Sequence, residues 1–184
     1  GSRHAYEKFE RGPAVNERLG AAETAFIAAR DSFYLATVGE TGWPYVQHRG
    51  GPPGFLKVLD ERTLGFADFR GNRQYVSVGN LRGDDRVSMF LMDYGAKRRL
   101  KLLGHARVVD TVNDPSMLER LAVPGYGARI ERGIVVEVAA FDWNCPQHIT
   151  PRFTRGEVEQ LVAGLTARIA DLEARLAATQ ANPT

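Results

Sequence analysis

The residues at positions 66–74, FADFRGNRQ, have the composition of an anion site. Gly71 permits a tight turn, and Arg70 and Arg73 place a guanidinium group on either side of it. With Asn72 as the N-cap of a helix, the first helical turn would offer free backbone N–H groups that suit a phosphate. A pair of arginines that is only solvated explains the same residue types, so the pattern alone leaves both interpretations open.

Two further groups of cations are candidate anion contacts. Lys57 lies in the middle of an otherwise apolar run at 55–60, where it either meets an anion or extends its ammonium group past the edge of a sheet. Arg99 and Lys101 share one face of a later strand, because alternate side chains of a strand point the same way. This face either contacts a ligand, or it belongs to a solvated edge strand whose charges prevent pairing with other chains.

The chain lacks the motifs of the common nucleotide and metal sites, namely GxxxxGK[ST], GxGxxG, GxSxG, HExxH and CxxC. Its four histidines fall on different expected elements without the spacing of metal ligands, so no metal site is expected. The single cysteine, Cys145, cannot form an intramolecular disulfide. It is expected to be an inert thiol, since a thiolate nucleophile needs a positioned base.

Composition limits the classes of protein to which the chain can belong. Its 184 residues are 43% hydrophobic and 25% charged, which is typical of one globular core and excludes disorder. The net charge of +2 is too small to predict a nucleic-acid or membrane partner. No transmembrane span or secretory signal is recognisable, and with one cysteine the expected location is cytoplasmic.

The elements that must position these residues are mainly strands. Helices are expected at 13–30, from 72 to about 82, and at 115–121. Runs rich in β-branched and aromatic residues, bounded by turn residues, predict short strands at 32–38, 43–48, 55–60, 63–69, 86–94, 98–110 and 133–143. Strands joined by hairpin turns, about six in number, favour an antiparallel barrel over a parallel α/β sheet.

The C-terminal segment changes to helical periodicity. Thr154 and Glu157 form a T-x-x-E capping box. Apolar residues then recur at spacings of four and three, as in a coiled coil: Val158, Val162, Leu165, Ile169, Leu172 and Leu176. This stripe pairs with a second copy or packs on its own barrel. The expected organisation is therefore a tail at 1–12, a barrel domain at 13–153 and a dimerisation or packing helix at 154–180.

Four segments in order carry a resemblance to a known family: PYVQHRGGPPGFLK, GFADFRGNRQ, RRLKLLGHARV and DWNCPQHITPRF. From about residue 33 to residue 153 the chain resembles the pyridoxamine 5'-phosphate oxidase-like flavin-nucleotide-binding proteins. The resemblance implies a mainly β fold, a six-stranded antiparallel split β-barrel of the FMN-binding type with a C-terminal amphipathic helix. It also implies a homodimer that binds FMN at the subunit interface.

The resemblance assigns contacts with FMN to residues that match the family's motifs, and among them it assigns the phosphate to the loop at 72–74 and to Arg49. Lys57 matches the lysine that ends the family's R-x-V-L-L-K strand, but Pro52 occupies the arginine position of that motif. Arg49, three residues upstream, is the nearest replacement. The family's S-R-K phosphate triplet is matched by Asn72, Arg73 and Gln74, of which the last lacks the lysine charge.

The resemblance also assigns contacts to the flavin ring. Ala67 and Asp68 match strand positions that meet the isoalloxazine edge, and Arg99 falls where the family has the glutamine of R-Q-V-R. Trp143 and Arg152 match a C-terminal tryptophan and arginine that approach the flavin. Arg99 is the candidate cation for the N1 and C2 carbonyl edge of the ring, where negative charge develops on reduction.

The residues at 143–148 are expected to close over the flavin, with Gln147 and His148 as hydrogen-bonding groups. The alternative is a structural corner, in which Trp143 fills the core and His148 caps a loop.

The expected function is that of an FMN-binding oxidoreductase of unknown substrate, because the family's segment for the vitamin B6 substrate is not recognisable here. No catalytic residue is assigned. The alternatives are a non-enzymatic flavin-binding or sensor module and a deazaflavin (F420)-dependent reductase on the same barrel. A haem protein, with His48, His105 and His148 as generic axial candidates, is a further alternative.

Overall fold

The computed structural model describes residues 16–143 and 146–180. It consists of two compact units, a first unit that ends at residue 148 and a second unit formed by 94–97 and the residues from 149 onward. The N-terminal tail at 1–12 and Cys145 lie outside the described residues. No helix in the described part of the chain has the length and apolarity needed to cross a membrane.

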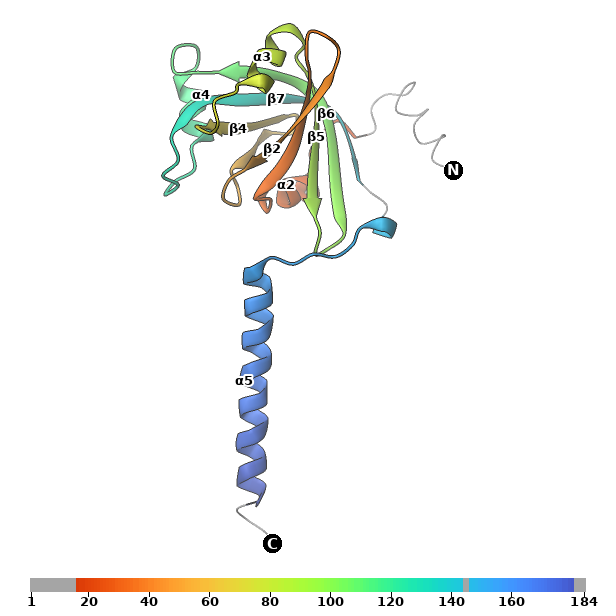
Figure 1. Ribbon diagram of the computed structural model, residues 1–184, viewed down its shortest axis with the longest axis vertical. Coiled ribbons are helices and arrows are strands. Elements are labelled where there is room, and N and C mark those ends of the chain that lie inside the picture. The colour runs from red at the N-terminus through yellow and green to blue at the C-terminus, as the bar shows by residue number, and fades with distance from the viewer. Residues whose placement is uncertain (1–15, 144–145, 181–184) are drawn as a thin grey trace. The chain divides into compact units, whose positions relative to one another are not determined.

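The first unit is built on one antiparallel sheet with the strand order β2-β1-β5-β6-β7-β4-β3 (Figure 1). The expected fold class, a mainly β antiparallel split barrel with flanking helices, is confirmed. The sheet has seven strands rather than six because the short edge strand β3 also pairs with β4. The bounds are β1 Ser32–Val38, β2 Pro44–Gly50, β3 Leu56–Asp60, β4 Thr63–Phe69, β5 Arg86–Asp93, β6 Arg98–Val109 and β7 Ile130–Trp143.

The sheet curls around its apolar core. Phe33 on β1 packs edge-on against Phe66 on β4, with ring centroids 5.0 Å apart, although three strands separate β1 from β4 in the sheet. Phe55 stacks on Phe33 at 5.6 Å. All three rings are about 1% exposed, so burying them fixes the curvature that brings the two halves of the sheet together.

The long strands β6 and β7 form a ribbon that holds the two halves in one sheet. Their register shifts between Leu103 and Gly104. A Cβ atom at Gly104 would lie 2.3 Å from the Glu137 carbonyl oxygen, so only glycine allows this close approach of the two backbones. The paired part of this ribbon has two ends, one at Leu100 and Trp143 and the other at Val109 and Gly133.

The first unit also contains short helices: α2 Ala21–Ala28, α3 Val76–Gly83, α4 Pro115–Leu121 and the single-turn η1 Pro146–His148. α2 is shorter than the helix expected at 13–30, and of that range residues 13–15 lie outside the described part. The prediction that Asn72 caps a helix is wrong. α3 begins at Val76, because Tyr75 takes the left-handed conformation with φ 55° and ends the loop there.

The second unit contains the long helix α5, Arg155–Gln180. The predicted capping box is present, since the Thr154 backbone N–H donates to Glu157 Oε2 at 2.6 Å and the Glu157 N–H donates to Thr154 Oγ1 at 3.2 Å. The apolar stripe on α5 is exposed, with fractions between 46% and 60% at its six positions.

Candidate functional site

Charged side chains from four segments gather near the C-terminal end of β4. They come from β2, from the end of β4 and the loop that follows it, and from the start of β7, and they are linked by ion pairs and hydrogen bonds. We call this group the arginine cluster, and its members are Arg49, Asp68, Arg70, Arg73, Tyr75, Glu131 and Arg132.

Asp68 is the buried centre of the arginine cluster, with an exposed fraction of 7%. Its Oδ1 accepts a 2.6 Å hydrogen bond from Arg49 Nη1, and its Oδ2 lies 3.6 Å from Arg132 Nε. Arg132 is its direct neighbour in the β4–β7 pairing, so the sheet register sets this contact. Burial raises the pKa of the Asp68 carboxyl above its ordinary value, although the charges of Arg49 and Arg132 oppose that rise.

Tyr75 links the loop at 70–75 to β7. The Arg132 guanidinium lies over the Tyr75 ring at 4.5 Å, and the Tyr75 hydroxyl donates to Glu131 Oε2 at 3.1 Å. Arg73 Nε donates to the same hydroxyl at 3.3 Å. Both Arg73 and Tyr75 have positive φ angles, 62° and 55°, a backbone strain that often accompanies ligand sites.

The arginine cluster carries more positive than negative charge. Its four guanidinium groups face two carboxylates, which leaves an excess of two positive charges. The Nε of Arg49 is buried and has no hydrogen-bond partner among the described residues. A phosphate monoester carries a charge of about −1.5 to −2 with three acceptor oxygens, so the excess charge and the spare donor fit such a group.

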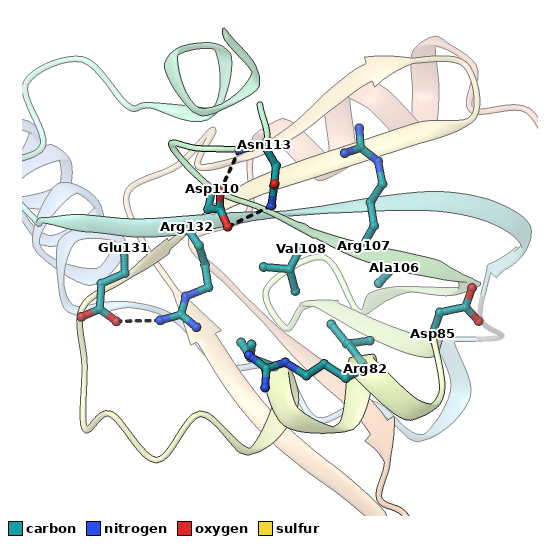
Figure 2. Close-up of a pocket in the computed structure, with 11 residues that line it drawn as sticks. Arg82, Asp85, Ala106, Arg107, Val108, Asp110, Asn113, Glu131 and Arg132 are labelled. Atoms are coloured by element: carbon teal, nitrogen blue, oxygen red, sulfur yellow. Dashed lines mark hydrogen bonds and ion pairs between the residues drawn. The ribbon is translucent and has the colours of Figure 1, made fainter. Parts of the chain in front are cut away.

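A cavity of about 700 Å³ adjoins the arginine cluster and shares Glu131 and Arg132 with it. Its walls come from α3, from the end of β6 with the loop that follows, and from the start of β7 (Figure 2). Figure 2 shows Arg82 and Arg107 among the lining side chains, together with Asp110 bonded to Asn113. This volume lies within the range of about 300 to 1,000 Å³ that is usual for small-molecule sites.

The structure brings five of the predicted site residues to this end of the sheet: Arg49, Asp68, Asn72, Arg73 and Gln74. Within the loop, Asn72 Oδ1 accepts from the Gln74 backbone N–H at 3.3 Å, and Asn72 Nδ2 donates to Gln74 Oε1 at 3.4 Å. The loop at 70–75 is exposed on the surface. Its polar groups are therefore accessible to an anion from solvent.

Two predicted residues on β3 and β4 have structural contacts with α4. Lys57 Nζ donates to the backbone carbonyls of Arg120 and Ala122, at 2.8 and 2.6 Å, and so caps the C-terminal end of that helix. Ala67 is 2% exposed and belongs to the small apolar cluster that includes Leu121. Their predicted contacts with a flavin stay predictions.

The remaining predicted residues are not members of the arginine cluster. Arg99 is at the start of β6, eight residues from the cavity-lining Arg107, a span of roughly 27 Å along a strand. Gln147 and His148 are exposed in η1. In the second unit, the Arg152 guanidinium lies over the Tyr94 ring at 4.9 Å.

Trp143 has the contacts of a structural corner in this chain. Its Nε1 donates to Glu23 Oε1 at 2.7 Å, and its ring packs edge-on against Phe26 at 4.8 Å. The Arg98 guanidinium covers the indole at 4.6 Å. These contacts agree with the part of the alternative in which Trp143 fills the core, while the loop cap by His148 and an approach of Trp143 to a flavin stay predictions.

Sequence reasoning missed Tyr75, Glu131 and Arg132 as members of the site. Tyr75 is 39% exposed, and its hydroxyl joins the arginine cluster. β7 begins at Ile130 rather than at Gly133, so Arg132 was not expected to pair with β4. The one available signal was the Glu-Arg pair directly before the predicted strand.

Comparison with known proteins bears on the family and the fold. The family model described as pyridoxamine 5'-phosphate oxidase matches residues 19–144. Among solved structures, a pyridoxamine 5'-phosphate oxidase from Lactobacillus delbrueckii, described as putative, has a TM-score of 0.53 at 17% identity and covers 70% of this chain and 96% of its own. HupZ from Group A Streptococcus has a TM-score of 0.50 at 11% identity and covers 73% and 100%. No curated protein matches the chain.

Proposed function

The chain belongs to the pyridoxamine 5'-phosphate oxidase family, and on that premise we propose that it is a flavoprotein whose arginine cluster holds the phosphate of FMN. The observation that carries the proposal is the excess of two positive charges around the buried Asp68, together with the spare Nε donor of Arg49. A phosphate would satisfy both.

The residues of the arginine cluster and the adjoining loop have different roles in the proposed phosphate site. Arg73 and the amide groups of Asn72 and Gln74 bind phosphate oxygens from the exposed loop. Arg49 binds from the buried side, and Asp68 fixes its orientation through the 2.6 Å hydrogen bond. Arg132 is a positioning residue, because it holds Asp68 on one side and the Tyr75 ring on the other.

Bound FMN would supply hydride and electron transfer, which makes oxidoreductase the proposed class of activity. The protein's contribution to that chemistry is a cation near the edge of the ring that becomes negative on reduction, and Arg99 is the proposed residue. Because Arg99 lies far along β6 from Arg107, we propose that the partner in a homodimer provides it. Trp143 and Arg152 would approach the flavin in the same way.

Affinity for FMN tests the phosphate site. In Arg73→Ala, the dissociation constant of FMN should rise by roughly tenfold to 150-fold, since a charge-assisted hydrogen bond is worth about 1.5 to 3 kcal/mol. Riboflavin, which lacks the phosphate, should bind the wild-type protein more weakly than FMN does. The matched control is Arg18→Ala, because Arg18 pairs with Glu61 at the opposite end of β4.

Quenching of flavin fluorescence measures each dissociation constant. Equal affinity of the wild type for FMN and riboflavin, or an unchanged affinity in Arg73→Ala, would refute the phosphate site. The absorption spectrum of the purified protein separates FMN from deazaflavin and haem. Reduction by NADH or NADPH followed by timed reoxidation then distinguishes an oxidoreductase from a module that only binds flavin.

A further inference from the structure

The exposed apolar stripe of α5 has the composition of a coiled-coil seam. We propose that α5 pairs in parallel and in register with α5 of a second copy of this chain. The proposal rests on the homodimer of the proposed function and specifies how its C-terminal helices meet. It makes no use of the flavin site.

The seam residues alternate between the two core positions of a heptad. The a positions are Val162, Ile169 and Leu176, and the d positions are Val158, Leu165 and Leu172. Two of the three a residues are β-branched and two of the three d residues are leucine, which is the arrangement that favours parallel two-stranded coiled coils. Each of these side chains is between 46% and 60% exposed, so the seam can bury substantial apolar area.

The charges beside the seam select the parallel orientation. Arg168 occupies a g position and Glu173 the following e position. In a parallel, in-register pair, a g residue lies beside the next e residue of the other helix, so Arg168 meets the partner's Glu173 on both sides of the seam. In an antiparallel pair, g faces g and e faces e, which would place like charges together.

Arg168 can make this contact without losing its bond within the helix. Its Nη1 donates to Asp171 Oδ2 at 2.8 Å, and Asp171 occupies a c position on the outer side of α5. A guanidinium group has five N–H donors in a fork, so one edge can remain on Asp171 while another meets the partner's Glu173. The bond to Asp171 also restricts the side chain before pairing.

The seam is short, so we expect the two helices to pair stably because the barrels to which they are attached also form a dimer. Fewer than three heptads form a marginal isolated coiled coil. Attachment to a barrel dimer makes the pairing of the helices intramolecular, which raises their effective concentration. A parallel pair also sends both chains toward the barrels at the same end, so one twofold axis can pass through the helices and the barrels.

Disulfide trapping in the full-length chain tests the orientation. In a Cys145→Ser background, Leu172→Cys places a thiol at a d position, where parallel helices bring the two copies together. Mild oxidation should convert most of this variant to a covalent dimer. The control Ala174→Cys places the thiol on the outer face and should form at least roughly tenfold less dimer in the same time.

An antiparallel pair of helices would give a different pattern of cross-links. It would align position 162 of one helix with position 172 of the other, so a mixture of Val162→Cys and Leu172→Cys chains would cross-link while Leu172→Cys alone would not. That result, or equal cross-linking of Leu172→Cys and Ala174→Cys, would overturn the proposal.

Charge reversal tests the proposed pairs by sedimentation. Glu173→Arg faces the partner's Arg168 and should raise the dimer dissociation constant roughly tenfold, whereas Arg168→Glu with Glu173→Arg should restore it. No effect of either variant would overturn the pairing of these charges. FMN affinity, measured in the same samples, distinguishes the two proposals. Loss of cross-linking with FMN binding intact rejects the coiled coil, and intact cross-linking with FMN binding absent rejects the flavin site.

Discussion

The two ends of the β6–β7 ribbon are built from similar residue types but differ in what those residues contact. At the Trp143 end, the indole packs against Phe26, the Arg98 guanidinium lies over both rings, and the indole N–H is hydrogen-bonded to Glu23. At the Arg132 end, a guanidinium also covers an aromatic ring, that of Tyr75. That ring lies at the surface next to a cavity and an excess of arginine charge.

The difference shows that arginine–aromatic pairs alone do not identify a ligand site. The Trp143 corner uses its arginine to cover an indole that packs against the core. The arginine cluster has an excess of two positive charges and adjoins a cavity of small-molecule size. The cavity and the excess charge, rather than the arginine–aromatic contact, therefore mark this end as the candidate binding site.

The largest effect is expected on removal of the carboxylate at the centre of the arginine cluster. Asp68→Ala leaves Arg49 and Arg132 without their buried counter-charge, so the free energy of unfolding should fall by about 3 to 5 kcal/mol in urea titrations. Added inorganic phosphate should recover part of that loss. The control Asp84→Ala removes a carboxylate paired with the exposed Arg86 and should change stability far less. A loss in Asp68→Ala as small as the control's would contradict the central role of Asp68.

A smaller loss of stability is expected at the Trp143 end of the β6–β7 ribbon. Glu23→Ala removes the acceptor of the Trp143 N–H and of the Gly20 backbone N–H, which should cost about 1 to 2 kcal/mol in the free energy of unfolding. The affinity for FMN should stay within roughly twofold if the phosphate dominates binding at the distant arginine cluster. A tenfold weaker affinity would show that the proposed approach of Trp143 to the flavin contributes to binding as strongly as the phosphate contacts do.

The smallest expected effect is a difference between Asp68 and Glu23 in how each makes the free energy of unfolding depend on pH. Burial raises the pKa of Asp68. Burial also acts to raise the pKa of Glu23, but hydrogen bonds from Trp143 and from backbone N–H groups outweigh it and leave the Glu23 pKa below its ordinary value. Glu23 therefore contributes stability above about pH 4.5 that is lost as the pH falls through its folded-state pKa, whereas protonation of Asp68 in acid relieves a cost of burial.

Unfolding in urea between pH 7 and pH 3 measures this difference. Glu23→Gln should lose less stability than the wild type as the pH falls, because its contribution no longer titrates. Asp68→Asn should lose more stability than the wild type as the pH falls, because protonation can no longer relieve the cost of burying a charged carboxylate. If both variants lost more stability than the wild type as the pH falls, or both lost less, the two carboxyl groups would not differ in this way.

The strands and the position of the loop at 70–75 could be predicted because they depend on local sequence. Alternating apolar residues and turn residues mark strands such as Ser32–Val38 and Thr63–Phe69 directly. The N-cap at Asn72 was wrong because a left-handed Tyr75 delays the helix, and a tyrosine rarely adopts that conformation. The contact between Asp68 and Arg132 depends on the register of strands more than sixty residues apart, which a single sequence does not reveal.

The Lys57 cap on α4 has a consequence for how the protein behaves at high concentration. β3 is an edge strand, and an edge strand offers free N–H and C=O groups to strands of other molecules. Here the strand is only five residues long, has an irregular register between Val58 and Asp60, and is tied through Lys57 to the end of α4. A strand that is short, kinked and tied down by a lysine is a poor template for β-sheet growth, so this edge protects the folded protein against aggregation.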